Sequence, residues 1–262
     1  MKSYSLWDYT SDEIKTMAPN YVAIQPVAAV EQHGPHLPLG TDSLIANAFV
    51  EHLRARLQAE NFPGLLLPLM PYGKSNEHLN YPGTVTYSAQ TYLNVLLDIG
   101  RSCARAGFQA LVFVNAHGGN RELLDVAVRE IRIETGLSAF SIQPSILPKD
   151  RTQMGCEMSP EELRFGIHAG RVETAAILHL HPELVHMEKR KAAYPTCFDG
   201  CRYLDFSGKA SHGWMTQDVS ETGAVGDPTG STPEEGAAWL SCVTDELFQA
   251  LLEIVSFRRT GG

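Results

Sequence analysis

The feature that most constrains the fold of this chain is an apolar run that ends in a polar loop and is followed by an amphipathic helical pattern. Residues 21–30 (YVAIQPVAAV) are typical of a buried strand, and after the loop EQHGPHLPLGTD the apolar side chains of residues 43–57 fall on one helical face. The pattern returns where residues 109–115 (QALVFVN) stop at AHGGN and residues 120–134 take helical periodicity. Such alternation predicts an α/β fold, whose ligand sites lie beyond the carboxyl ends of parallel strands.

The rest of the chain adds elements of the same kind. Two more strands are expected at residues 65–70 and 136–143, and further helices at residues 88–106, within 161–179 and at 233–257. Thr41 to Ser43 offer capping residues for the helix over 43–57. Residues 181–230 are rich in Gly, Pro, Ser and Asp, and such a long irregular stretch is typical of a lid or an intersubunit arm. No repeat or linker divides the chain, so we expect one domain over residues 1–262.

Composition excludes several classes of partner. The chain carries 21 Lys and Arg against 30 Asp and Glu, a net charge of −9, without a dense basic block that would bind nucleic acid or anionic lipid. No uncharged stretch reaches the roughly 18 residues of a membrane span, and the N-terminus lacks a signal-peptide core, so we expect a cytoplasmic protein. Five cysteines at irregular spacings fit reduced thiols, and the pair Cys197 and Cys201 is weak evidence for zinc.

Five side chains at three element boundaries form a candidate metal-ligand set. Glu31 and His33 are two residues apart at the end of a strand, so their side chains point to the same side. Asp42 follows a turn rich in Gly and Pro, His117 follows the strand over 109–115, and Glu173 opens a helix. Carboxylate and imidazole ligands in this mixture suit zinc, manganese or iron.

The ligand set is large enough for two divalent metal ions. A dinuclear site about 3.5–4 Å across needs a bridging carboxylate, and it lowers the pKa of a bound water and polarises a carbonyl group under attack. A single ion with three protein ligands remains an alternative, as does a purely structural role of these residues as loop caps and solvated polar groups. The chain has neither GxGxxG nor GxSxG, which argues against a dinucleotide site and a serine nucleophile.

Other residues are candidates for substrate contact. Gly118 and Gly119 let backbone N–H groups approach a carboxylate or an oxyanion closely. Asn120 is expected to hold the metal loop, to touch substrate or to cap the helix that follows. Glu77 and His78 follow the second strand and are candidates for lining the pocket, with a salt-linked loop pair as the alternative.

Two histidines outside the ligand set are also of interest. His168 lies near Glu173 in the sequence and is a candidate for carrying a proton to the leaving amine, which with Glu173 makes up the predicted catalytic pair. A helix-capping or core role for His168 is the alternative. His36 is expected to fix its loop rather than to bind substrate.

Five motifs together resemble the creatininase (creatinine amidohydrolase) family. They are VAAVEQHGPHLPLGTD at 27–42, PYGKSNEH with YPGT at 71–84, NAHGGN at 115–120, HAGRVET at 168–174 and GAVGDPTGST at 223–232. The resemblance implies a three-layer α/β/α sandwich with a mostly parallel sheet, two divalent metal ions and hydrolysis of an amide C–N bond. It also implies a homo-oligomer, commonly a hexamer.

Carried over by motif, the resemblance implies ligand roles. Glu31 is then a ligand of the first metal, His33 a ligand of the second, and Asp42 the bridge between them. His117 completes the ligand set of the first metal. True creatininases have Tyr-Glu where this chain has Gly118-Gly119, and that glutamate is a ligand of the second metal. Members with HGGN keep a glutamate in HAGxxET, so Glu173 is assigned as the substitute ligand by chemical need.

The resemblance also bears on substrate. Creatininases place tryptophans and a Glu-His pair around the creatinine ring, whereas here Ile167 precedes His168 and no Trp lies between Trp7 and Trp214. Creatinine is therefore not the expected substrate. Relatives of the HGGN type act on other amides, including formamides of pyrimidine precursors and peptides trimmed during redox-cofactor maturation. We expect an amidohydrolase of a small amide, with a peptidase or a metal-binding protein without turnover as alternatives.

Overall fold

The computed structural model of the chain describes residues 4–146, 158–206 and 210–257. Its strands are β1 (Val22–Val27), β2 (Gly64–Leu66), β3 (Ala110–Asn115) and β4 (Ser138–Ile142). Its α-helices are α1 (Ser11–Met17), α2 (Thr41–Ala59), α3 (Ala89–Ala106), α4 (Arg121–Thr135), α5 (Pro160–Phe165), α6 (Arg171–Leu180), α7 (Thr216–Val219) and α8 (Pro233–Ser256). Short 3-10 turns are η1 (Leu6–Asp8), η2 (Ala18–Asn20), η3 (Asn76–His78), η4 (Gly118–Asn120), η5 (Pro144–Ile146), η7 (Pro182–Leu184) and η8 (Met187–Lys189).

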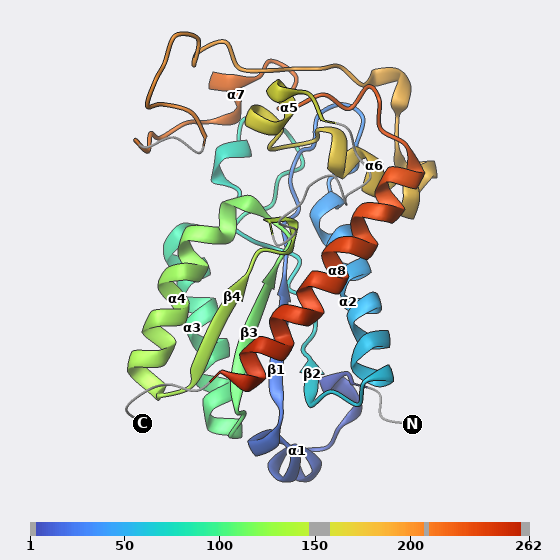
Figure 1. Ribbon diagram of the computed structural model, residues 1–262. Coiled ribbons are helices and arrows are strands. Elements are labelled where there is room, and N and C mark those ends of the chain that lie inside the picture. Colours follow the sequence, from blue (N-terminus) through green and yellow to red (C-terminus); the bar gives the residue numbers. More distant parts are fainter. Residues whose placement is uncertain (1–3, 147–157, 207–209, 258–262) are drawn as a thin grey trace.

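The four strands form one parallel sheet in the order β2-β1-β3-β4, with helices on both faces (Figure 1). Alternate residues of the strands point to opposite faces. On one face Ala23, Val27 and Leu111 pack among the side chains of α3 and α4. On the other face Ile24 and Val112 pack against α2 and α8. This layering confirms the predicted three-layer α/β/α sandwich.

The predicted boundaries differ from the structure where the chain leaves the sheet. The apolar run over 21–30 outlasts β1, since β1 ends at Val27 and the Ala28 N–H then donates to the Met70 carbonyl at 3.0 Å. The capping role predicted for Thr41 to Ser43 is wrong. Helix α2 has Gly40 at its N-cap without a side-chain cap. Thr41 Oγ1 instead donates to the Pro38 carbonyl, and Ser43 Oγ donates to the Ala29 carbonyl, so both hydroxyls hold the preceding loop.

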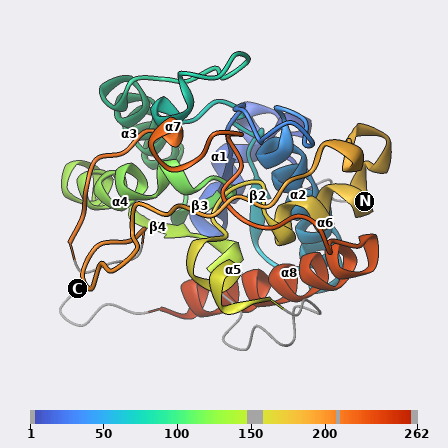
Figure 2. The ribbon, with the colours of Figure 1, turned by 90° about the horizontal axis from the view of Figure 1, so that it is seen from above.

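The helix expected to open near HAGRVET within 161–179 is confirmed as α6, and a second short helix, α5, precedes it. Gly166 and Gly170 separate α5 from α6, which starts at Arg171 within HAGRVET. Residues 181–230 contain only short helical turns in their described part, and they run across the end of the sheet where the strands finish (Figures 1 and 2). Within the described ranges, no helix combines the length and apolarity that a membrane span requires.

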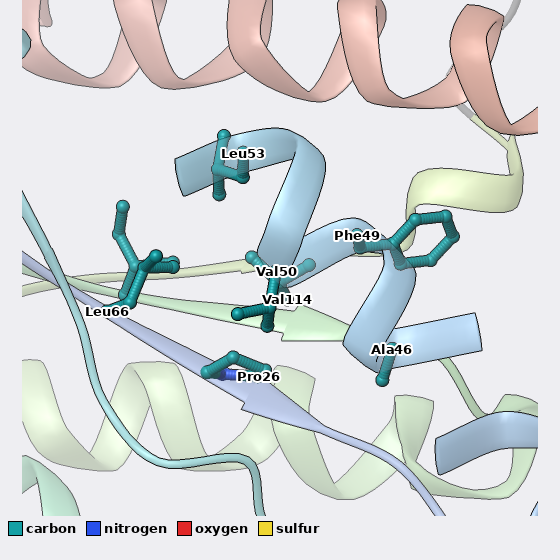
Figure 3. Close-up of a pocket in the computed structure, with 8 residues that line it drawn as sticks. Pro26, Ala46, Phe49, Val50, Leu53, Leu66 and Val114 are labelled. Atoms are coloured by element: carbon teal, nitrogen blue, oxygen red, sulfur yellow. The ribbon is translucent and has the colours of Figure 1, made fainter. Parts of the chain in front are cut away.

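An apolar cavity lies between α2 and the sheet, away from the polar loops (Figure 3). Its volume is about 10 Å³, and it is lined by Ile24, Pro26, Ala46, Phe49, Val50, Leu53, Leu66 and Val114. A space of this size is at the lower limit for one water molecule, and an apolar lining offers a water no hydrogen-bond partners. The cavity is therefore a packing gap in the core and has no room for a substrate.

Candidate metal centre

The predicted ligand residues meet at the carboxyl end of the sheet. Glu31 and His33 follow β1, Asp42 is the second residue of α2, His117 follows β3, and Glu173 lies in the first turn of α6. The first four side chains are at most 5% exposed, and Glu173 is partly exposed. The parallel order of β1 and β3 as neighbours brings their two following loops together.

Asp42 lies between two groups of ligand atoms. Its Oδ1 is 3.3 Å from His33 Nε2, and its Oδ2 is 3.1 Å from His117 Nδ1. Glu31 Oε1 is 3.4 Å from His117 Nδ1, and Glu173 Oε2 is 3.9 Å from His33 Nε2. Three trios of described residues each bring their ligand atoms within 4.8 Å of one another: Glu31-Asp42-His117, His33-Asp42-Glu173 and Glu31-His33-His168. Asp42 belongs to the first two, as a bridging ligand would.

Several buried polar atoms of this cluster lie beside one another but make no hydrogen bond. Within the described part of the chain, Glu31 Oε2, His33 Nε2 and Asp42 Oδ2 are buried without a hydrogen bond. Leaving such an atom unsatisfied costs about 1–3 kcal/mol and more for a charged group, so three converging cases call for a ligand. Carboxylate oxygens and imidazole nitrogens suit divalent zinc, manganese or iron. The residues present therefore fit divalent cations.

The pKa shifts of the candidate ligands also favour the binding of cations. Burial raises the pKa of Glu31 to about 7, against the lowering effect of His117, and burial also raises the pKa of Glu173. Burial by itself lowers the pKa of each ligand histidine, but Asp42 outweighs it at His33 and raises that pKa to about 9. Glu31 and Asp42 raise the pKa of His117 to about 10 in the same way. Without metal, the carboxylates hold protons on their neighbours, and bound cations would replace those protons.

The hydrogen bonds of the histidine rings assign which nitrogen faces the centre. His117 Nε2 is 3.0 Å from the Lys74 carbonyl, His33 Nδ1 is 3.1 Å from the Glu31 carbonyl, and His168 Nε2 is 2.7 Å from the Gln32 carbonyl. A nitrogen that donates to a carbonyl leaves the other nitrogen of a neutral ring as an acceptor. In all three rings, the other nitrogen is the one near the carboxylates, and it would be the acceptor once His33 and His117 are neutral, as metal ligands must be.

His168, the predicted proton carrier, lies directly beside the cluster. Its Nδ1 is 3.6 Å from Glu31 Oε1, and its ring centroid is 4.2 Å from that of His33 and 4.4 Å from that of His78. Burial and the neighbouring His33 hold the pKa of His168 well below its usual value. The ring is therefore neutral near pH 7 and presents a free acceptor to the centre.

The predicted substrate contacts take different places. His78 Nε2 is 3.4 Å from Glu31 Oε1, so His78 borders the cluster itself. Glu77 accepts a hydrogen bond from Lys74 Nζ at 2.9 Å, so it is salt-linked within its loop, but to Lys74 rather than to His78. Asn120 is fully buried, and its side chain donates to the Ala28 carbonyl and accepts from the Lys74 N–H. Asn120 makes no side-chain cap for α4, and its contacts support the role of holding the loop.

The two glycines differ in the space around them. A Cβ atom at Gly118 would meet nothing within 4 Å, whereas a Cβ at Gly119 would lie 2.4 Å from Glu77 Oε1 and 2.6 Å from His117 Nε2. Position 119 therefore has no room for any side chain. The glutamate ligand that the resemblance places there in creatininases cannot be accommodated, which supports a substitute from elsewhere in this chain.

Sequence reasoning missed residues that contact the candidate ligands' neighbours and fix the loops around them. The Gln32 side-chain amide donates to the Gly223 carbonyl at 3.0 Å and lies 2.7 Å from His78 Nδ1. Thr216 Oγ1 lies 2.8 Å from the same ring nitrogen. His36, expected to fix its loop, lies 3.0 Å from Thr174 Oγ1 in α6. The position of Gln32 between two ligand residues was a signal that could have identified it, whereas the irregular surroundings of Thr216 gave none.

Comparison with known proteins gives consistent matches. The family model for creatininase (creatinine amidohydrolase) matches residues 7–251. The chain is 34% identical over 246 residues to the mycofactocin precursor peptide peptidase of Mycobacterium tuberculosis (strain ATCC 25618 / H37Rv), covering 90% of this chain and 86% of that protein. It is 30% identical over 193 residues to the creatinine amidohydrolase of Pseudomonas putida, covering 68% and 71%. A solved mutant creatininase described as the Zn-Zn type superposes with a TM-score of 0.76 at 24% identity, over 97% and 99% of the two chains.

Proposed function

Because the chain belongs to the creatininase (creatinine amidohydrolase) family, and is thus a hydrolase of amide or peptide C–N bonds, we propose that it is a metal-dependent peptidase acting on a precursor peptide. The observation that carries the proposal is the position of Asp42 between two ligand trios. The choice of a peptide is supported by the mycofactocin precursor peptide peptidase, which matches far more of the chain than the creatinine amidohydrolase does.

We assign two divalent ions to the centre. Glu31, Asp42 and His117 would hold one ion, and His33, Asp42 and Glu173 would hold the other. Solved creatininases include a Zn-Zn type and a Mn form, so zinc and manganese are the first candidates, with iron as the third. When bound, such ions lower the pKa of a water molecule and polarise the amide carbonyl.

The remaining chemistry falls to side chains around the ions. His168 keeps a neutral ring with Nδ1 facing the centre, so it can accept a proton there and deliver it to the leaving nitrogen. Gly118 is exposed next to His117, and a Cβ there would meet nothing within 4 Å, so this position does not block the approach of a peptide. The ion pair between Lys74 and Glu77 fixes the Glu77 side chain, which lies next to Gly119.

A second candidate function is hydrolysis of a small amide, such as a cyclic amide or a formamide. The creatinine amidohydrolase similarity favours it, and the centre needs no change for it. A metal-binding chain without turnover is the third candidate. We also propose a homo-oligomer, following the family resemblance, with sedimentation velocity as its check.

The test compares substrates and variants in one assay. Purified protein is incubated with a synthetic mycofactocin precursor peptide, creatinine and an N-formyl amide, and products are identified by mass spectrometry. We expect cleavage of the peptide, its loss on chelation of the metals, and its recovery on adding zinc or manganese. Asp42→Asn should abolish cleavage, whereas Glu51→Gln, exposed on the same helix, should leave it unchanged.

The outcomes separate the candidates. Turnover of creatinine or the formyl amide without cleavage of the peptide would replace the peptidase assignment by the small-amide one. Bound metal without any turnover would favour the third candidate. Undiminished cleavage by Asp42→Asn after chelation would contradict metal-dependent hydrolysis altogether.

A further inference from the structure

A buried carboxylate on α5 joins three segments that are far apart in the sequence. Glu162 is 6% exposed. Its Oε1 accepts the Arg171 N–H at 2.8 Å, and its Oε2 accepts the Asp227 N–H at 2.7 Å and the Tyr194 hydroxyl at 3.0 Å. Glu162 lies outside every motif that the sequence singled out, and none of these contacts involves the metal centre.

Three glycines make room for this carboxylate. A Cβ atom at Gly166 would lie 2.4 Å from Glu162 Cδ, one at Gly170 would lie 2.5 Å from Oε1, and one at Gly226 would lie 3.1 Å from both oxygens. Gly170 belongs to the motif HAGRVET and Gly226 to GAVGDPTGST. The two motifs therefore meet around Glu162, and their glycines are the residues that its carboxylate requires.

Glu162 supplies the cap that α6 lacks. Helix α6 starts at Arg171, and its N-cap residue, Gly170, has no side chain with which to bond the first N–H groups. The Glu162 carboxylate bonds the Arg171 N–H instead, and its negative charge lies at the positive end of the helix dipole. Glu173 lies in the same first turn, so Glu162 helps to fix the backbone from which this ligand extends.

The same carboxylate acts on the His168 side of the loop. The Asp227 N–H that it binds follows a backbone pairing in which the Val225 N–H donates to the His168 carbonyl at 2.8 Å and the Val225 carbonyl accepts from the His168 N–H at 3.1 Å. Between His168 and α6, the Ala169 N–H donates to Glu173 Oε2 at 2.6 Å. Ala169 holds a left-handed φ of 52°, which a non-glycine residue keeps only where its surroundings enforce it.

We propose that Glu162 is a positioning residue for the second metal ion: it bonds the Arg171 N–H at the end of the loop over 166–171 and the Asp227 N–H next to the segment that pairs with His168, so that Glu173 and His168 reach the centre together. This inference rests on the proposed function, since it assigns Glu173 to an ion shared with His33 and Asp42. Tyr194 ties the irregular stretch over 181–230 to the same carboxylate. The other trio, Glu31-Asp42-His117, has no direct contact with this anchor.

The test is Glu162→Gln, measured by calorimetric titration of metal-free protein with Mn²⁺. Glutamine has the same shape but only one acceptor oxygen, so its amide group must face either the Arg171 N–H or the Asp227 N–H. We expect one Mn²⁺ site as in the wild type and the other weakened by about 10- to 100-fold, as for residues that orient a ligand. In the peptide assay, kcat should fall while KM changes little.

The matched control is Glu161→Gln, an exposed carboxylate on the same helix, which should bind both ions as the wild type does. Unchanged affinities in Glu162→Gln would overturn the inference, and so would equal weakening of both sites, which indicates general loosening. If Glu162→Gln does not fold, Tyr194→Phe should give the same selective change at smaller size, and no change there would overturn it. A wild-type chain that binds fewer than two ions contradicts the proposed function itself.

Discussion

The surroundings of Gly119 leave no space for a side chain at this position beside the proposed metal centre. A Cβ there would lie 2.6 Å from the Lys74 carbonyl as well as close to Glu77 and His117. Each of these three residues is held by another contact: the Lys74 N–H donates to Asn120 Oδ1, Glu77 accepts from Lys74 Nζ, and His117 Nε2 lies 3.0 Å from the Lys74 carbonyl. These atoms cannot move aside without turning the His117 ring, which is consistent with our proposal that Glu173 of α6 supplies the carboxylate for which position 119 has no room.

The neighbouring glycines provide a matched test at this scale. Gly119→Ala must displace Glu77 or His117, so we expect metal affinity to fall by about 10- to 100-fold, as when the residues that orient a ligand are lost. Gly118→Ala enters open space and should keep the wild-type metal affinity. Metal content after dialysis against a weak chelator measures both, and equal retention by the two variants would disprove the crowding argument.

Those residues of the candidate site whose positions follow from their spacing along a strand could be predicted from the sequence. Two residues on a strand end set Glu31 and His33 side by side, and equivalent strand ends brought His117 near them. Glu173 came from the family resemblance and chemical need. Thr216, which lies 138 residues from its partner His78, and the Glu162 contacts depend on long-range packing that no local pattern encodes.

At the scale of elements, the position of α6 depends on how closely it approaches α8. Gly236 in the first turns of α8 is buried, and a Cβ there would lie 2.0 Å from the Ala175 carbonyl oxygen of α6. The side chain of Glu235 pairs with Arg171, the first residue of α6. The two helices are thus fixed to one another near the turn that carries Glu173.

Gly236→Ala tests this contact. In a free helix alanine would be favoured over glycine by about 1 kcal/mol. The clash with a backbone atom of α6 should reverse the sign and lower the free energy of unfolding by about 1–3 kcal/mol, the usual range for overpacking. Urea unfolding measures the change, with Gly213→Ala as the control because a Cβ there meets nothing within 4 Å. A stabilised Gly236→Ala variant would refute the close approach of these helices.

Element types were easier to predict than their ends. The apolar runs identified β1 and β3, since a buried parallel strand has no polar face to obscure it. The other two strands were also predicted, although β4 is mostly half-buried and contains two serines. Their ends depend on where the backbone finds its next partner, as when Ala28 leaves the sheet to bond Met70. The break between α5 and α6 at Gly166 and Gly170 follows from the Glu162 carboxylate, which a local helical pattern does not report.

At the scale of the whole molecule, the sheet delivers residues from four separate elements to one end. The loops after β1 and β3 and the first turns of α2 and α6 converge there, under the stretch over 181–230 (Figures 1 and 2). The three-layer arrangement could be predicted from the alternation of strands and helices. The course of residues 181–230 could not, because it lacks periodicity and is fixed by single contacts such as that of Tyr194. The expectation of one domain stays a prediction.

The central claim is that Asp42 bridges two divalent ions, and anomalous X-ray diffraction from crystals grown with zinc or manganese tests it most directly. We predict two anomalous peaks in each chain, one beside Glu31 and His117 and the other beside His33 and Glu173, with the Asp42 carboxylate between them. A single peak, or two peaks of which either lies away from Asp42, would contradict the account.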